Sequence, residues 1–253
     1  MSYFLFDNRK ISYTEQGEGI PLLLLHGNTA SSNMFHEAYP KYAEDYRVIM
    51  IDFLGHGESD RLDEFPADLW YYEAEQVIAF LKNKQYGKVN IIGCSGGALV
   101  AINVGLEAPE LVNKIIADSF EGEKSLRPFT DSIYADREKS KHDKDTQMFY
   151  YYMHGTDWEK VVDNDTAAII KHDKEIGCFF HKSLQTLQPY IFLTGSKEDE
   201  FMSFQPNYLE NTYRNIINKV GHGKIHLFES GRHPAMLSNQ EDFYKISKKF
   251  LDE

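Results

Sequence analysis

The chain has 253 residues, of which 42% are hydrophobic and 26% charged, the balance of a globular protein large enough to bury a substantial core. Its 39 acidic side chains outnumber its 27 Lys and Arg, and the resulting net charge of -12 repels phosphate backbones and anionic lipid headgroups, so neither nucleic acid nor a membrane surface is an expected partner. Cys94 and Cys178 form no CxxC pair, which indicates reduced thiols in a cytoplasmic protein and no metal site.

The amino-terminal stretch, residues 1–7, carries neither a basic leader nor a small-residue cleavage site. No apolar run elsewhere approaches the roughly 20 residues that span a bilayer. We therefore expect a soluble protein that is not processed at this end. The sequence gives no indication of its oligomeric state.

The first predicted elements are two antiparallel strands, residues 3–6 and 11–14, joined by a turn at residues 7–9 that is rich in Asp and Asn. Short apolar runs without polar alternation follow, the pattern of strands that are covered on both faces. These runs are residues 22–25, 48–51, 89–92, 115–117, 190–193 and 225–228. We expect them to lie parallel in one sheet, which the opening hairpin extends to eight strands.

Helical patterns alternate with these strands, which predicts an α/β fold with helices on both faces of a mostly parallel sheet. The helices are expected at residues 68–84, 97–107, 206–219 and 240–251. Residues 121–188 differ, because they are polar and aromatic and show no strand pattern. Helices are expected there near 129–139, 146–152 and 165–174. We interpret this segment as a helical cap inserted into a single core formed by residues 1–120 and 189–253.

A serine stands where the third parallel strand turns sharply into a helix, in the sequence Gly93-Cys94-Ser95-Gly96-Gly97. Flanking glycines suit such a turn, because it crowds the backbone and holds the serine in a sparsely populated conformation. This is the pattern of a nucleophile elbow, in which the hydroxyl is lifted clear of the sheet. Ser95 is therefore the candidate nucleophile.

A serine hydroxyl needs an adjacent base, and the base needs a carboxylate that fixes its tautomer. Both are expected at the carboxyl ends of other strands, where ligands bind in open α/β sheets. His233 follows the last predicted strand in a loop marked by Gly231 and Pro234, and it is the candidate base. His222 and His226 are spaced as zinc ligands on a helix would be, but the glycines beside them argue against a helix, and no metal or cofactor is expected.

The acid is less certain, because three acidic residues share the loop after the strand at 190–193. Asp199 is the candidate, and the chain order Ser, Asp, His is the order expected for this architecture. Glu198 and Glu200 are close rivals, and Asp118, at the end of another strand, would face the same edge of the sheet.

Attack on a carbonyl also needs donors aimed at the developing oxyanion. His26-Gly27-Asn28 directly follows the first parallel strand, so the backbone N–H of Asn28 is expected to pair with that of Gly96. The later segment 52–59 is interpreted as a structural turn in which Asp52 braces backbone amides.

Taken together, these motifs resemble the α/β-hydrolase fold superfamily over nearly the whole chain. The motifs that carry the resemblance are His26-Gly27, Asp52-x-x-Gly55-x-Gly57-x-Ser59, Gly93-x-Ser95-x-Gly97, the loop 195–199 and Gly231-x-His233-Pro234. The resemblance implies a Ser/Asp/His triad, no cofactor, and hydrolysis of esters, amides or related bonds through an acyl-enzyme. The aromatic stretch 148–158 distantly resembles the small caps of esterases acting on aminoacyl or short acyl esters.

Two departures from that family pattern matter. The acid loop has one residue more than usual between Gly195 and Asp199, which puts Glu198 at the commoner position and keeps the acid open. Asn28 after His26-Gly27 is also similar to haloalkane dehalogenases, but those use an aspartate nucleophile where this chain has Ser95, so dehalogenation is disfavoured.

The leading hypothesis is a serine hydrolase of the carboxylesterase type that acts on a small-molecule ester. An aminopeptidase-like or aminoacyl-ester hydrolase is an alternative, because Glu121 and Glu123 at the start of the cap could pair with a substrate ammonium. A ligand-binding signalling protein that retains the triad is another, since a fold does not fix a function. The sequence does not identify the substrate.

Overall fold

The computed structural model describes residues 2–202 and 204–253, so Met1 of the amino-terminal stretch lies outside the described residues. Its strands are β1 (Ser2–Phe6), β2 (Arg9–Gln16), β3 (Ile20–Leu25), β4 (Tyr46–Ile51), β5 (Val89–Cys94), β6 (Val112–Asp118), β7 (Tyr190–Ser196) and β8 (Lys224–Phe228). Its helices are α1 (Tyr39–Tyr42), α2 (Leu69–Lys84), α3 (Gly96–Glu107), α4 (Arg127–Ser140), α5 (Lys144–His154), α6 (Trp158–Glu175), α7 (Tyr208–Val220), α8 (Ala235–Ser238) and α9 (Gln240–Asp252). Short 3-10 turns lie at Ser32–Phe35, Pro109–Leu111, Gly155–Asp157 and Leu184–Thr186.

The described strands form one eight-stranded sheet in the order β1-β2-β4-β3-β5-β6-β7-β8. Strands β3 to β8 run parallel, whereas β2 is antiparallel to both β1 and β4. The hairpin turn consists of Asp7 and Asn8, both at positive φ, which is the backbone that a two-residue turn between twisted strands requires. The mostly parallel α/β sheet predicted from the apolar runs is therefore confirmed.

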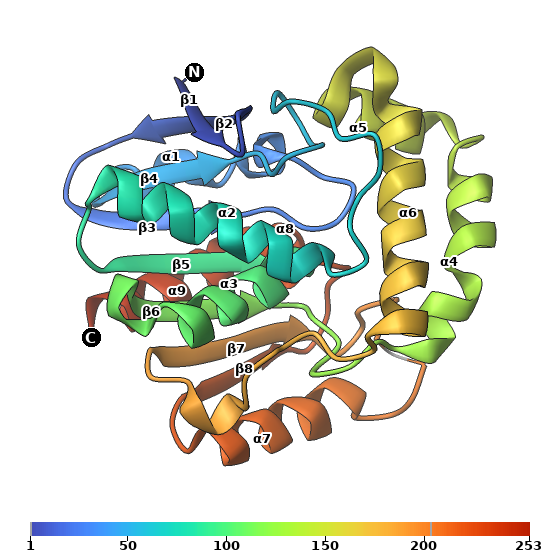
Figure 1. The fold of residues 1–253 in the computed structure, drawn as a ribbon. Coiled ribbons are helices and arrows are strands. Elements are labelled where there is room, and N and C mark those ends of the chain that lie inside the picture. The colour runs from blue at the N-terminus through green and yellow to red at the C-terminus, as the bar shows by residue number, and fades with distance from the viewer. Residues whose placement is uncertain (1, 203) are drawn as a thin grey trace.

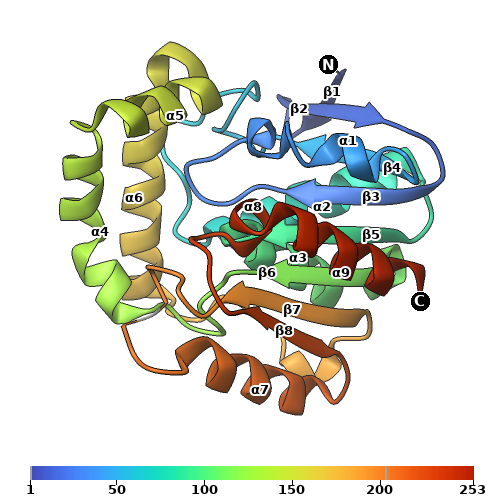
Figure 2. The same cartoon turned by 180° about the vertical axis from the view of Figure 1, so that it is seen from behind.

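Helices cover both faces of the sheet, and each face has its own apolar core. Helices α2, α3 and α7 pack on one face (Figure 1). The buried side chains there include Val77, Leu99 and Tyr213. Helices α1, α8 and α9 pack on the other face (Figure 2). Tyr42 and Phe250 are among the residues buried there. The parallel strands are covered on both sides, which explains why they read as continuous apolar runs.

The segment between β6 and β7 stands apart from the sheet as helices α4, α5 and α6, at the edge toward which the parallel strands point (Figure 1). Helix α6 begins at Trp158, seven residues before the predicted start at 165. Its buried side chains Val161 and Ile169 belong to the same apolar core as α2 and α3. The segment therefore packs against α2 and lies over the carboxyl ends of the strands (Figure 1), which is where side chains for chemistry are expected.

Two short helices, α1 and α8, were not predicted, because four residues are too few to show a helical period. Within residues 2–202 and 204–253, none of the helices combines the length and the apolar character needed to cross a bilayer.

Candidate active site

Ser95 occupies the sharp turn between β5 and α3, with φ 56° and ψ -125°. This conformation is rare for a residue with a side chain, and the surrounding packing has to impose it. A Cβ atom on Gly93 would lie 2.1 Å from the carbonyl oxygen of Gly97, and a Cβ on Gly97 would lie 2.2 Å from that of Leu25. Glycine at these positions lets α3 start directly against the strands, and the partly exposed Ser95 is held above the sheet edge.

The imidazole of His233 is bound by the carboxylate of Asp199, with 2.7 Å between Nδ1 and Oδ2. A carboxylate accepts, so Nδ1 carries the proton and Nε2 is left as the basic nitrogen. The other oxygen of Asp199 accepts from the backbone N–H of Phe201 at 3.0 Å, which fixes the carboxylate in turn. Burial lowers the pKa of His233, but the hydrogen bond and charge of Asp199 outweigh it, so the pKa is raised overall.

The other three candidate acids have different partners. Glu198 is exposed, and Glu200 accepts from the backbone N–H of His233 at 3.0 Å rather than from its ring. Asp118 is fully buried, accepts from Thr194 Oγ1 and from the backbone N–H of Met236, and has its pKa raised to about 7 by burial. Of these four acids, Asp199 is the one that the fold brings to the imidazole.

The loop after β3 lies against the serine. A Cβ on Gly27 would be 2.9 Å from that of Ser95, and a Cβ on Gly96 would be 2.1 Å from the side-chain oxygen of Asn28. His26 anchors the start of the loop, because Nε2 accepts from the backbone N–H of Phe53 and Nδ1–H donates to the Gly27 carbonyl. Burial holds the pKa of His26 well below its usual value, which keeps the ring neutral as this bonding requires.

The amide groups predicted to bind an oxyanion therefore lie in adjoining backbone segments beside Ser95. Gly96 is the first residue of α3, and the first N–H groups of a helix have no acceptor within that helix. The Asn28 side chain is held by two residues that the sequence did not single out, since its Nδ2 donates to Asp165 at 2.8 Å and its Oδ1 accepts from Trp70 Nε1 at 3.1 Å. No local pattern marked these partners, because one lies on α2 and the other on α6.

A cavity of about 330 Å³ separates these groups from the α4–α6 segment, and both Ser95 and His233 line it. Most of its wall is apolar or aromatic. The apolar and aromatic lining includes Met34, Trp70, Leu99, Leu126, Phe129, Ile133, Phe149, Tyr150, Ile169, Phe201, Met202 and Leu237. Charged groups enter the lining at Glu121, Asp136 and Arg137, so the cavity suits a small, largely apolar molecule with a polar end.

The remaining predicted features contribute to this cavity only in part. Of the aromatic stretch 148–158, Phe149 and Tyr150 line it, whereas Met148, Tyr151 and Tyr152 are exposed. Asp52 accepts from the backbone N–H groups of two loops, Ser32 at 2.7 Å and Glu58 at 3.0 Å, which is a structural role. In the described part of the chain, no three His, Cys, Asp or Glu side chains are grouped to hold a metal ion.

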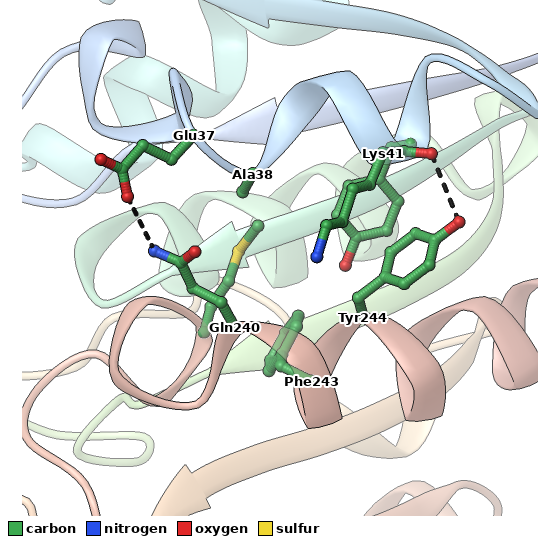
Figure 3. A pocket seen from close by; sticks show the side chains of 8 residues that line it. Glu37, Ala38, Lys41, Gln240, Phe243 and Tyr244 are labelled. Atoms are coloured by element: carbon green, nitrogen blue, oxygen red, sulfur yellow. Dashed lines mark hydrogen bonds between the residues drawn. The ribbon is translucent and has the colours of Figure 1, made fainter.

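A second pocket lies between residues 37–41 and helix α9 (Figure 3). Gln240 Nε2 donates to Glu37 Oε2 at 3.4 Å, and Tyr244 OH donates to the Lys41 carbonyl at 3.3 Å. Its volume is about 10 Å³, at the limit for one water molecule. The cavity beneath the α4–α6 segment is the candidate active site, because Ser95 and His233 line it.

Known proteins support the same fold. The sequence profile of the alpha/beta hydrolase fold matches residues 20–173. The (E)-2-((N-methylformamido)methylene)succinate hydrolase of Acinetobacter baylyi is 33% identical over 112 residues, which are 44% of this chain and 41% of that protein. The 2-hydroxy-6-oxo-6-(2'-aminophenyl)hexa-2,4-dienoic acid hydrolase of Metapseudomonas resinovorans is 25% identical over 94% of this chain and 86% of its own length. An esterase structure from Exiguobacterium antarcticum superposes with a TM-score of 0.77 at 19% identity, covering 98% of this chain and 97% of that one, which shows a common fold.

Proposed function

This chain belongs to the alpha/beta hydrolase fold family and is a hydrolase, and we propose that it cleaves a small carboxylic ester or related acyl bond through an acyl-enzyme. The observation that carries this proposal is the Asp199–His233 hydrogen bond of 2.7 Å at a cavity that Ser95 also lines. A strained serine, an oriented imidazole and a largely apolar chamber are the parts that acyl transfer needs.

In the proposed mechanism, the Ser95 hydroxyl attacks the substrate carbonyl while Nε2 of His233 takes its proton. The carbonyl oxygen becomes an oxyanion, which the N–H groups of Asn28 and Gly96 bind. The tetrahedral intermediate collapses, the alcohol leaves with the proton held by His233, and Ser95 is acylated. Water then repeats these steps to release the acid, and Asp199 keeps the imidazole in the right tautomer throughout.

The cavity supports a small acyl or alkyl group. Its volume of about 330 Å³ lies at the lower end of the range for small-molecule sites. Two of the related hydrolases are named for substrates that carry carboxylates. The wall of this cavity includes Glu121 and Asp136 as well as Arg137, so acidic side chains outnumber Lys and Arg in it. A neutral or cationic substrate therefore fits this cavity better than a carboxylate does.

The test is labelling with a fluorophosphonate probe, followed by hydrolysis of p-nitrophenyl esters of increasing acyl length. We expect modification at Ser95, loss of both labelling and turnover in Ser95→Ala, and a preference for short chains. Ser132→Ala is the matched control, because Ser132 lies on α4 and its hydroxyl bonds the Phe129 carbonyl at 3.4 Å. Undiminished turnover by Ser95→Ala contradicts the mechanism, and absence of turnover across the panel together with ligand-dependent association with a partner favours the signalling alternative.

One observation favours a cationic ester as a more specific substrate. Glu121 lines the cavity, and burial raises the pKa of its carboxyl to about 7, so a substrate ammonium would draw it into the charged form. Glu123 has a different partner, because it forms an ion pair with Lys219 of α7. An aminoacyl ester should therefore be hydrolysed faster than its N-acylated analogue, and the difference should disappear in Glu121→Gln. Equal rates for both esters in the wild type contradict this version.

A further inference from the structure

The residue after Asn28 has a strained backbone. Thr29 has φ 54°, in the left-handed region where a β-branched residue is unfavourable. Both polar groups of its backbone are bound by side chains from the α4–α6 segment. Its N–H donates to Asp165 Oδ2 on α6 at 3.2 Å, and its carbonyl accepts from His154 Nε2 on α5 at 3.0 Å. The strain is therefore held in place from outside the core sheet.

The ring of His154 is suited to this contact. Its Nδ1 accepts from the backbone N–H of Gly57 at 3.1 Å, so Nε2 carries the hydrogen that the Thr29 carbonyl accepts. Burial lowers the pKa of His154 to about 3, which keeps the ring neutral and this tautomer in place at neutral pH. One side chain thus links the Thr29 backbone to the turn that follows β4.

Asp165 binds the same loop through a charged group. Its Oδ2 accepts from the Asn28 side chain at 2.8 Å and from the Thr29 N–H, while Arg137 Nη1 lies 3.7 Å from Oδ1 and His56 Nε2 lies 3.8 Å from Oδ2. Its side chain is fully buried, where an isolated carboxylate would be costly. Burial raises its pKa, but the neighbouring His56, Arg137 and Asn28 outweigh this, so the pKa is lowered and the charge is kept.

These contacts surround the peptide group between Asn28 and Thr29. Asp165 accepts from the Asn28 side chain and from the N–H of that peptide group, which belongs to Thr29, and His154 donates to the Thr29 carbonyl in the following peptide group. The Asn28 N–H belongs to the preceding peptide group, which φ and ψ of Asn28 join to this one, so fixing the Asn28–Thr29 peptide restricts the direction of that N–H. We propose that Asp165 and His154 are positioning residues that aim this N–H at the substrate oxyanion, so that the α4–α6 segment completes the oxyanion site as well as covering the cavity.

This inference rests on the proposed function, and its test follows from the energetics of an oxyanion donor. Loss of one donor costs roughly 10² to 10³ in kcat. For Asp165→Ala we therefore expect kcat for a p-nitrophenyl ester to fall about 10²-fold, with KM within about threefold. Affinity for a trifluoromethyl ketone, which forms an oxyanion on Ser95, should fall by the same factor as kcat, since it depends on the same donor.

Two further variants make the experiment specific. Asp163→Ala on the same helix is the matched control, because Asp163 is exposed and pairs with Lys141 at the surface; it should leave kcat and inhibitor affinity unchanged. Asp165→Asn keeps the shape of the side chain and guards against simple unfolding of the alanine variant. The amide oxygen can still accept from both donors, as Oδ2 does, but the negative charge is lost and an NH2 group faces Arg137 Nη1 in place of Oδ1. We therefore expect a loss of about tenfold in kcat, and a melting temperature nearer to that of the wild type than that of Asp165→Ala.

The outcomes separate the two proposals. A wild-type protein that the fluorophosphonate fails to modify at Ser95 overturns the proposed function. A labelled and active wild type whose Asp165→Asn variant keeps full kcat and full trifluoromethyl ketone affinity overturns only the positioning role. Equal losses of ground-state and oxyanion affinity in that variant also overturn it, because general damage to the cavity affects both.

Discussion

Replacing Gly93 by alanine tests how the strand-to-helix turn creates the nucleophile. The new Cβ would lie 2.1 Å from the Gly97 carbonyl oxygen and 2.8 Å from the Ala98 nitrogen, whereas Cβ contacts in proteins are essentially never closer than 3.0 Å. Both neighbours are backbone atoms in the first turn of α3 and cannot rotate away. The start of α3 must therefore move by about 1 Å, and a displacement of that size can cost about 10²-fold in rate. Ser95 lies within this moving segment.

The same clash should destabilise the fold. Overpacking of a tight core costs roughly 1–3 kcal/mol. For a chain of this size, each 1 kcal/mol corresponds to about 2–4 °C in melting temperature, so Gly93→Ala should melt roughly 2–12 °C below the wild type. The assays are the rate of fluorophosphonate labelling and thermal unfolding followed by fluorescence.

Gly195→Ala is the matched control, because Gly195 is also a sheet glycine near the site. Its Cβ would meet Leu209 Cδ1 at 3.1 Å and Leu227 Cδ2 at 3.6 Å, the ends of flexible side chains that can give way. We expect this control to cost less than about 1 kcal/mol and to leave the labelling rate near that of the wild type. If Gly93→Ala labels as fast as this control and melts no lower, the steric account of the elbow is wrong.

Two further predictions concern the imidazole. Asp199→Asn should lower kcat about 10⁴-fold by favouring the wrong tautomer of His233. The exposed neighbour Glu198→Gln should have little effect, and steady-state turnover of both variants decides between the two acids. Burial lowers the pKa of His233, but Asp199, and after it Asp118 and Glu200, raise it above 6.5 overall, and the protonated ring cannot accept the serine proton. As the pH is lowered, kcat/KM of the wild type should therefore fall with an apparent pKa above 6.5. The residual activity of Asp199→Asn should show the same fall at a lower pH. A wild-type pKa at or below 6.5 contradicts the proposed effect of Asp199 on His233.

Much of the fold could be predicted from local sequence patterns, because strands that are buried on both faces of a parallel sheet consist of consecutive apolar residues. The runs 89–92 and 115–117 contain only side chains that tolerate such burial, apart from Asn90, and they became β5 and β6. The helix at 158–175 was predicted only from residue 165. The buried face of this helix includes Asp165 and His172. Both are polar residue types, so the sequence did not indicate that they are buried; they are buried because other parts of the fold pack around them or form hydrogen bonds with them.

The acid in the loop after β7 could not be chosen from sequence spacing. A shift of one residue in a loop turns a side chain from the cavity to solvent, and Glu198, Asp199 and Glu200 differ by such shifts. Asp199 points inward in the structure, with one oxygen on His233 and the other on the Phe201 N–H. That arrangement depends on where β7 ends relative to β8, which the sequence does not record.

By itself, the sequence determined the α/β architecture, the serine at the turn after β5 and the histidine after β8, because each follows from residue types within a few positions of one another. Only the tertiary structure decided which acid meets the histidine and how helices α5 and α6 contact the loop after β3. Asp165 accepts a hydrogen bond from Asn28, which is 137 positions away in the chain, and its charge survives burial because Arg137 and His56 lie beside it. Hydrogen bonds and charge pairs of this kind depend on distances in space, and a one-dimensional pattern carries no measure of them.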